Sequence, residues 1–336
     1  MKEGGLSGIS LHIKQGTSYS ERPISYSLDL GMENPDTGKP IDSLTVFPAG
    51  SLGEPIVAYM VLKLAAVGQI DLDRPLYRYL GTPLPGDSDW ASILTDERAR
   101  RLTARLVLSH QSGLAFSRQA MPDRRLRLET TPGDSFGYSE DAYSLLYPVL
   151  ESISGRPFHD LAKAMVFEPS GMPRSSFGWE DRFEGHVPRP MNGGANPMNV
   201  FFTSAADFDK FVWLFALFGG DLPTEYLLPY MGFPTISVKT ASMKDHNRAT
   251  SAASLPKGLS WFLGWGRYEL PNVLLGNGFF VGGRKNGIES YATAFESRNS
   301  TALTVLLIGP GGHSMMSRIL KEILGEIESP LAWMGL

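Results

Sequence analysis

Alternating apolar and polar positions near both ends of the chain predict β-strands. Gly8 to Ile13 has strand character, and in Ile24 to Leu30 apolar residues alternate with serine and aspartate. A period of two is typical of a strand that buries one face. Three β-rich segments toward the C-terminus predict further strands: Asn272–Leu275, Ser290–Phe295 and Leu303–Ile308.

Helical spacing of apolar residues predicts helices between and after these strands. Pro55 to Val67 is apolar around most of its circumference, which is typical of a buried helix. Pro55 suits a first helical turn and Gly68 suits a helix end. His313 to Glu328 predicts an amphipathic terminal helix, and shorter helices are predicted at Thr103–Ser109, Glu140–Ser154, Phe158–Phe167 and Ala205–Phe218.

The order of these elements predicts how the chain is divided. Strands and a buried helix come first, a helical region follows, and strands with a terminal helix complete the chain. An economical packing brings both ends into one sheet covered by helices. We therefore predict a discontinuous α/β domain, residues 1–75 and 262–336, and a mainly helical domain, residues 76–261.

Composition excludes several classes of function. Lysine and arginine number 31 against 35 aspartate and glutamate, a formal charge of −4, which argues against a general nucleic-acid binder. The chain has no cysteine, which rules out disulfides, thiolate metal sites and a cysteine nucleophile. The histidines lack metal-ligand spacing, and no nucleotide-binding loop is present. We expect no cofactor, no metal and a small-molecule substrate; the sequence leaves the oligomeric state open.

Targeting signals are also missing from the sequence. No apolar segment reaches the roughly 18 residues that a membrane helix needs. The first residues, Met1 to Leu6, lack the apolar stretch of a signal peptide. We therefore expect a cytoplasmic protein, or a mature form whose leader has been removed, with no membrane partner.

Three segments carry candidate chemistry. Phe47–Pro55 leads into the predicted buried helix and contains a serine, Ser51. Leu102–Leu114 contains the run Leu-Ser-His-Gln-Ser-Gly-Leu, and Pro132–Tyr143 contains Tyr138 within a Gly-Tyr-Ser sequence.

In this order and spacing, the three segments resemble the superfamily of serine β-lactamases, penicillin-binding proteins and related esterases, most closely its class C-like branch. Phe167–Met172 and Gly264-Trp265-Gly266 fit the same pattern. The resemblance runs from about residue 8 to residue 324. It implies an α/β (α+β) serine β-lactamase-like, or DD-peptidase, fold: an antiparallel sheet flanked by helices, plus a helical domain.

The resemblance also implies a mechanism. In this superfamily a serine attacks an acyl carbonyl, a lysine one helical turn later activates it, and a tyrosine supplies a second acid/base group. A Lys- or His-x-Gly motif on an edge strand faces the substrate, and backbone N–H groups of the serine and of that strand hold the oxyanion. Ser51 and Tyr138 match the serine and the tyrosine.

This chain departs from the superfamily at three positions. The lysine position is Glu54, the third residue of the tyrosine motif is Glu140, and the strand motif reads Val281-Gly282-Gly283. A register shift of one or two residues would bring Arg284 or Lys285 into that motif. A carboxylate at 54 disfavours a neighbouring alkoxide but can act as a general base. Without a cation on the strand, binding of a substrate carboxylate is weakened, which argues against a true β-lactamase.

Each candidate residue also has a purely structural interpretation. Ser51 can cap the helix, Tyr138 can be a packing aromatic, and Glu140 can be the acidic start of the following helix. Glu54 can be a replacement of the lysine in an inactive site. His110, in the second segment, is interpreted as a structural residue of a loop.

Three functions follow from these interpretations. The first is acyl hydrolysis or transfer through Ser51, with Tyr138 and Glu54 handling protons. The second is acid/base isomerisation, cyclisation or elimination by Glu54, Tyr138 and Glu140 without an acyl-enzyme, since two nearby carboxylates can divide into an acid and a base. The third is a catalytically inactive relative that binds a ligand or partner.

Overall fold

A computed structural model of the chain describes residues 5–16, 23–34, 38–86, 88–184, 186, 200–216, 221–222, 259–269, 277–285, 287–295 and 300–325. Its main feature is an eight-stranded sheet in the order β3-β2-β1-β11-β10-β9-β8-β7, with every neighbouring pair antiparallel. The strands are β1 (Gly8–Gly16), β2 (Ile24–Asn34), β3 (Lys39–Pro40), β7 (Leu259–Trp261), β8 (Gly266–Glu269), β9 (Asn277–Lys285), β10 (Ile288–Phe295) and β11 (Ser300–Ile308).

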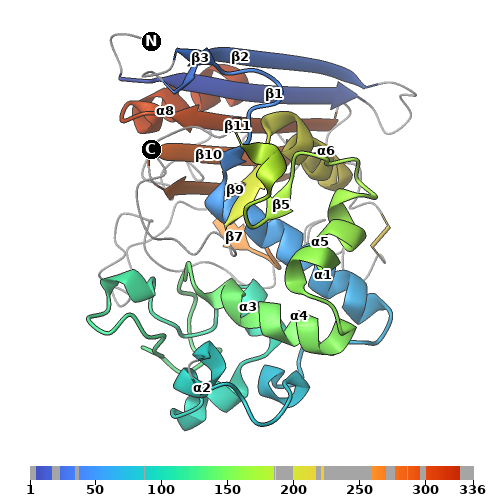
Figure 1. Ribbon diagram of the computed structural model, residues 1–336, viewed down its shortest axis with the longest axis vertical. Helices are drawn as coiled ribbons and strands as arrows, with labels where there is room; N and C mark the ends of the chain where they lie inside the picture. The colour runs from blue at the N-terminus through green and yellow to red at the C-terminus, as the bar shows by residue number, and fades with distance from the viewer. Residues whose placement is uncertain are drawn as a thin grey trace.

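The two ends of the chain meet in this sheet. β1 pairs with β11 along its whole length, from Gly8 opposite Ile308 to Gly16 opposite Ser300. Figure 1 shows the first two strands, in blue, beside the last strand, in red. The expected antiparallel sheet built from both ends and flanked by helices is therefore confirmed.

Helices cover both faces of the central strands, because successive residues of a strand point to opposite sides. The apolar side chains of β2, by contrast, were expected to be buried on one face and are exposed. On β11, Val305 and Leu307 pack with Met316 of α8 (Gly312–Leu324), whereas Leu306 belongs to the larger cluster that includes α6 (Ala205–Ala216). α6 contacts β1, β10 and β11, and α8 contacts β10 and β11. The sheet is therefore the middle layer between two helical layers.

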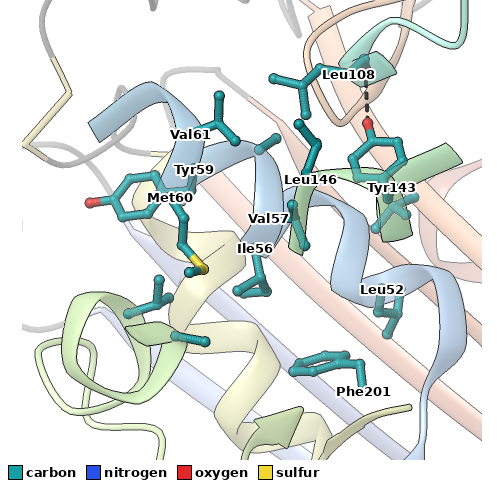
Figure 2. Close-up of a cluster of buried hydrophobic side chains, with 14 of the residues drawn as sticks. Leu52, Ile56, Val57, Tyr59, Met60, Val61, Leu108, Tyr143, Leu146 and Phe201 are labelled. Carbon is teal, nitrogen blue, oxygen red and sulfur yellow. Dashed lines mark hydrogen bonds between the residues drawn. The ribbon is translucent and has the colours of Figure 1, made fainter. Parts of the chain in front are cut away.

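The buried helix predicted at Pro55–Val67 is α1 (Gly53–Ala66), and 11 of its 14 residues are buried. It lies between the sheet and the helical region (Figure 1). Figure 2 shows Ile56, Val57 and Met60 of α1 packed among side chains from the helical region, including Leu146. The other elements of that region are α2 (Asp89–Ile93), α3 (Ala104–Leu108), α4 (Leu146–Ser154), α5 (Phe158–Ala162) and the short helices η2 (Leu76–Tyr79), η3 (Glu97–Arg101), η4 (Arg118–Ala120), η5 (Ala142–Leu145), η6 (Lys163–Phe167) and η7 (Asp181–Phe183).

A second, three-stranded sheet sets the position of the residues before α1. It consists of β4 (Phe47–Pro48), β6 (Phe201–Thr203) and β5 (Ser176–Phe177), in that order. The Ala49 N–H donates to the Phe201 carbonyl, just ahead of the short helix η1 (Gly50–Leu52). A Cβ on Gly53 would lie 2.9 Å from side-chain atoms of Phe177 and Phe201, so the start of α1 lies directly on this sheet.

Some predicted elements differ in detail. The helix expected at Glu140–Ser154 divides into η5 and α4, because Pro148 lacks an N–H and is tolerated only in a first helical turn. Strands β7, β8 and β9 were not predicted from periodicity, and the strand predicted at Asn272–Leu275 lies outside the described residues. The predicted boundaries between the two domains, after residue 75 and after residue 261, stay a prediction. Helix α6 belongs to the segment predicted as the helical domain, yet it packs on the large sheet.

Candidate active site

Ser51 lies in η1, directly before α1, and its side chain is partly exposed. The preceding residue, Gly50, has φ +53°, a conformation that residues with a Cβ rarely adopt. This turn presents the Ser51 hydroxyl at the N-terminal end of the buried helix. The helix was predicted to begin at Pro55, and it begins two residues earlier, at Gly53.

Glu54 lies one helical turn after Ser51 and is 6% exposed. Its Oε1 accepts a hydrogen bond from the Tyr138 hydroxyl at 2.6 Å. Its Oε2 lies 3.3 Å from Nε2 of His110. A buried carboxylate needs such donors, because burying an unpaired charge is costly.

Tyr138 joins Ser51 to Glu54. Its hydroxyl oxygen is 2.8 Å from Ser51 Oγ and 2.6 Å from Glu54 Oε1. A phenol has one proton, and the carboxylate can only accept, so that proton serves the bond to Glu54. The contact between the two hydroxyls then uses the Ser51 proton, and the three groups form a chain in which serine donates to tyrosine and tyrosine donates to glutamate.

The surroundings of Tyr138 keep its phenol protonated. Burial and then the negative charge of Glu54 raise the pKa of Tyr138 well above its usual value near 10. A free phenolate at neutral pH is therefore excluded as the resting base. Tyr138 can instead pass a proton on, receiving one from Ser51 as it gives its own to Glu54.

His110 lies behind Glu54 and was assigned a structural role from sequence. The structure buries its side chain fully, in contact with Glu54 and with the ring of Tyr138 at a centroid distance of 4.2 Å. His110 and Glu54 are 56 residues apart, so no local spacing connects them. The signal that could have drawn attention to His110 is its position in one of the three motif segments, since the other two supply Ser51, Glu54 and Tyr138.

The strand motif lies beside the serine. A Cβ built on Gly283 of β9 would be 3.3 Å from both Cβ and N of Ser51, so the backbone of β9 approaches η1 closely. Ser290 Oγ of β10 lies 3.2 Å from the carbonyl oxygens of Ala49 and Gly283 and holds the two segments together. Gly283, which the resemblance assigns to the strand motif, therefore lies next to Ser51.

Residues around Gly283 point in alternating directions. The Val281 side chain is 1% exposed and belongs to the core cluster shared with α1. Gly282 and Arg284 belong to the opposite face of β9 from Gly283. Arg284 Nε lies 3.1 Å from Oε1 of Glu289. Because side chains alternate across a strand, Arg284 points to the face opposite Ser51. A register that brings Arg284 to the site does not occur in the structure, and the side chain of Lys285, the other candidate, lies outside the described residues.

Glu140 lies at the exposed end of the tyrosine segment. Its side chain is exposed, and its N–H donates to the Phe116 carbonyl at 2.8 Å. Its negative charge also contributes to the raised pKa of Tyr138, after the larger effects of burial and Glu54. Glu54 and Glu140 therefore occupy contrasting environments, one buried and one in solvent.

The described part of the chain holds no cluster of three or more His, Asp or Glu side chains suited to a metal ion. Within the same residues, none of the helices is both long and apolar enough to span a membrane.

Comparison with known proteins places this chain in a family. The sequence pattern of the Beta-lactamase family matches residues 2–318. Esterase EstB of Burkholderia gladioli is 30% identical over 175 residues, which cover 44% of this chain and 43% of the esterase. Penicillin-binding protein 4 of Amycolatopsis lactamdurans is 23% identical over 333 residues, which cover 90% of this chain and 82% of that protein.

Solved structures show the same architecture. An octameric penicillin-binding protein homologue from Pyrococcus abyssi superposes with a TM-score of 0.72 at 20% identity, covering 97% of this chain and 75% of the other. A penicillin-binding protein from Bacillus halodurans gives 0.69 at 18% identity, covering 96% and 98%. The chain therefore belongs to the Beta-lactamase family and has its serine β-lactamase-like fold. The match to the esterase spans less than half of that relative's length.

Proposed function

We propose that the protein is a serine hydrolase that cleaves esters of small molecules through an acyl-enzyme on Ser51. The observation that carries this proposal is the continuous chain of hydrogen bonds from Ser51 Oγ through the Tyr138 hydroxyl to Glu54 Oε1, at 2.8 and 2.6 Å. A nucleophile joined to a base through an acid/base group is the arrangement that acyl transfer requires. The esterase among the relatives supports the same class of substrate.

The chain of hydrogen bonds gives each proton a place in the reaction. Ser51 Oγ attacks the ester carbonyl as its proton passes to Tyr138 and the Tyr138 proton passes to Glu54. Collapse of the tetrahedral intermediate breaks the bond to the alcohol oxygen, which takes a proton back along the same path. Water then attacks the acyl-enzyme with the same proton transfers, giving a carboxylic acid and free Ser51. Glu54 thus takes the role of the base that the resemblance assigns to a lysine.

The unpaired end of β9 lies where an oxyanion hole for the tetrahedral intermediate is expected. β8 pairs with β9 only from Asn277 to Phe280, and β9 continues beyond that partner to Lys285. Gly283 in this extension lies against the Ser51 backbone, close enough that a Cβ would be 3.3 Å from Ser51 N. Backbone N–H groups from η1 and from this strand edge can stabilise the developing negative charge.

Charges near the site favour substrates without a carboxylate. Glu54 and Glu140 place negative charge around Tyr138, and the residue at the basic position of the strand motif is the buried Val281. Arg284 is paired with Glu289 on the other face of β9. The charges of the described side chains therefore favour neutral esters over esters with an acidic acyl group, because like charges repel.

Hydrolysis of p-nitrophenyl acetate and butyrate tests the proposal. Wild-type protein is expected to release nitrophenolate, and Ser51→Ala to abolish the enzymatic rate. Glu54→Gln keeps the shape but removes the base, and we expect it to lower kcat by about 100-fold or more. Glu97→Gln, an exposed acid in a surface ion pair with Arg100, is the matched control and should keep full activity.

The same experiment separates the second candidate. The bond between Tyr138 and Glu54 is a pairing of acid and base that could also serve isomerisation or elimination without Ser51. Turnover of a substrate that survives Ser51→Ala but not Glu54→Gln would replace the hydrolase by that function.

A further inference from the structure

We propose that His110 is a positioning residue: as a neutral imidazole it holds Glu54 and Tyr138 in the arrangement that activates Ser51. This inference rests on the proposed function, because it assigns a role within the same site. His110 is fully buried and lies behind Glu54, so it contacts neither solvent nor a substrate at Ser51. Its influence on the reaction must therefore pass through Glu54 and Tyr138.

Hydrogen bonds indicate which ring nitrogen of His110 carries the proton. The Ser139 N–H points at Nδ1 of the imidazole, with the two nitrogens 3.5 Å apart. A ring nitrogen that accepts a hydrogen bond has no proton, so the ring proton is on Nε2. Nε2 lies 3.3 Å from Glu54 Oε2 and therefore donates to the carboxylate. The Glu54 carboxylate receives one donor on each oxygen, Tyr138 on one side and His110 on the other.

Neighbouring rings hold the imidazole in this orientation. The centroids of Tyr138, Trp261, Tyr143 and Phe136 lie 4.2, 5.0, 5.3 and 6.0 Å from that of His110. Packing on so many sides leaves the ring little freedom to turn. The Nε2–H is thus fixed in direction before any substrate arrives.

The backbone and the side chain of His110 also hold the segment that carries Tyr138. Its carbonyl accepts a hydrogen bond from the Gly137 N–H at 2.7 Å, and its Nδ1 receives the Ser139 N–H. These two bonds are to the residues on either side of Tyr138. One residue therefore fixes both the phenol and the carboxylate that the Ser51 proton must reach.

Two substitutions separate positioning from simple packing. Gln places an N–H donor near the position of His Nε2, whereas Asn reaches only as far as Nδ1 and offers Glu54 no donor. His110 has φ +51°, a conformation that Asn tolerates better than Gln. If His110 were only a packing residue, His110→Asn should be the more stable and the more active variant. If the hydrogen bond to Glu54 matters, His110→Gln should be the more active one.

Ester turnover and urea unfolding of both variants test the proposal. We expect His110→Asn to lower kcat by about 100-fold with KM within about twofold, as for a misplaced catalytic group. His110→Gln should retain kcat to within about tenfold, although its midpoint of unfolding is no higher than that of His110→Asn. Equal losses of kcat, or losses that follow the unfolding midpoints, would overturn the role of the hydrogen bond.

Nitrogen NMR of the histidine side chains in the full-length protein tests the tautomer without any substrate. The proposal predicts a neutral ring at His110 with the proton on Nε2 at pH 7, identified by the loss of that signal in His110→Gln. A proton on Nδ1, or a doubly protonated ring, would contradict it. If wild-type protein hydrolyses no ester, the proposed hydrolase function is wrong. The NMR result then still shows which ring nitrogen of His110 carries the proton.

Discussion

The environment of Tyr138 changes the acid/base chemistry of its phenol. Burial and the charge of Glu54 raise the pKa of Tyr138 well above its usual value near 10. Its raised pKa means that the folded protein holds the phenol proton more tightly than the unfolded chain does. The contribution to stability is complete below about pH 10 and is lost as the pH rises through the folded-state pKa.

A tyrosinate titration measures this effect directly. Around pH 10, where an ordinary tyrosine ionises, the ultraviolet absorbance change of folded wild-type protein should equal that of Tyr138→Phe, because the raised pKa keeps the Tyr138 phenol protonated there. In urea, where the chain is unfolded, wild-type protein should show one additional tyrosine. A folded wild-type titration that exceeds the variant's by one tyrosine below pH 11 would contradict the buried, carboxylate-linked phenol.

At the residue scale, sequence and resemblance together pointed to Ser51, Glu54 and Tyr138, and the structure places these three within hydrogen-bond distance. Their spacing along the chain is informative because two of them share one helical turn. His110 could not be singled out in this way. Its contact with Glu54 depends on the tertiary path of the loop after α3, which local sequence does not specify.

The junction between η1, α1 and the small sheet is the element that sets the position of Ser51. Gly53→Ala tests it, because the added Cβ would lie 2.9 Å from atoms of both Phe177 and Phe201. Crowding of this kind costs about 1–3 kcal/mol, and we expect a loss of that size in urea unfolding. Gly81→Ala is the control, since its Cβ would meet nothing within 4 Å. Equal stability of the two variants would mean that the start of α1 is not packed on the small sheet.

At the same scale, strand β9 shows what periodicity misses. Gly278, Gly282 and Gly283 lower the strand propensity of this segment, so it lacks a strong local signal. Pairing with β10 along its length and with β8 over its first residues makes it a strand. Only the resemblance placed Val281-Gly282-Gly283 on a strand that faces the site. By contrast, α1 and α8 were predictable because their apolar residues recur at helical spacing.

On the scale of the whole molecule, the sheet and the helical region share one core. A single cluster of buried side chains includes Leu146 and Trp90 of the helical region and Leu306 and Ala292 of the sheet. Regions that share a core unfold together. The discontinuous sheet was predictable from the order of elements, whereas the order of its strands was not, since it depends on long-range pairing.

Two core truncations test this cooperativity. Leu146 and Leu306 are both fully buried, and replacing either by alanine should cost about 2–5 kcal/mol. In urea, both variants should show one transition, with coincident curves from tryptophan fluorescence and far-ultraviolet circular dichroism. Separate transitions, with each substitution affecting only one, would show two independent units.

The measurement that tests the central claim most directly is covalent labelling of the nucleophile. Incubation of the full-length protein with a fluorophosphonate, followed by intact mass and peptide mapping, should give one adduct, on Ser51. Labelling should be slower by about 100-fold in Glu54→Gln, since the proton of Ser51 then has no base to reach. A folded wild-type protein that acquires no adduct on Ser51 at any pH would contradict the account.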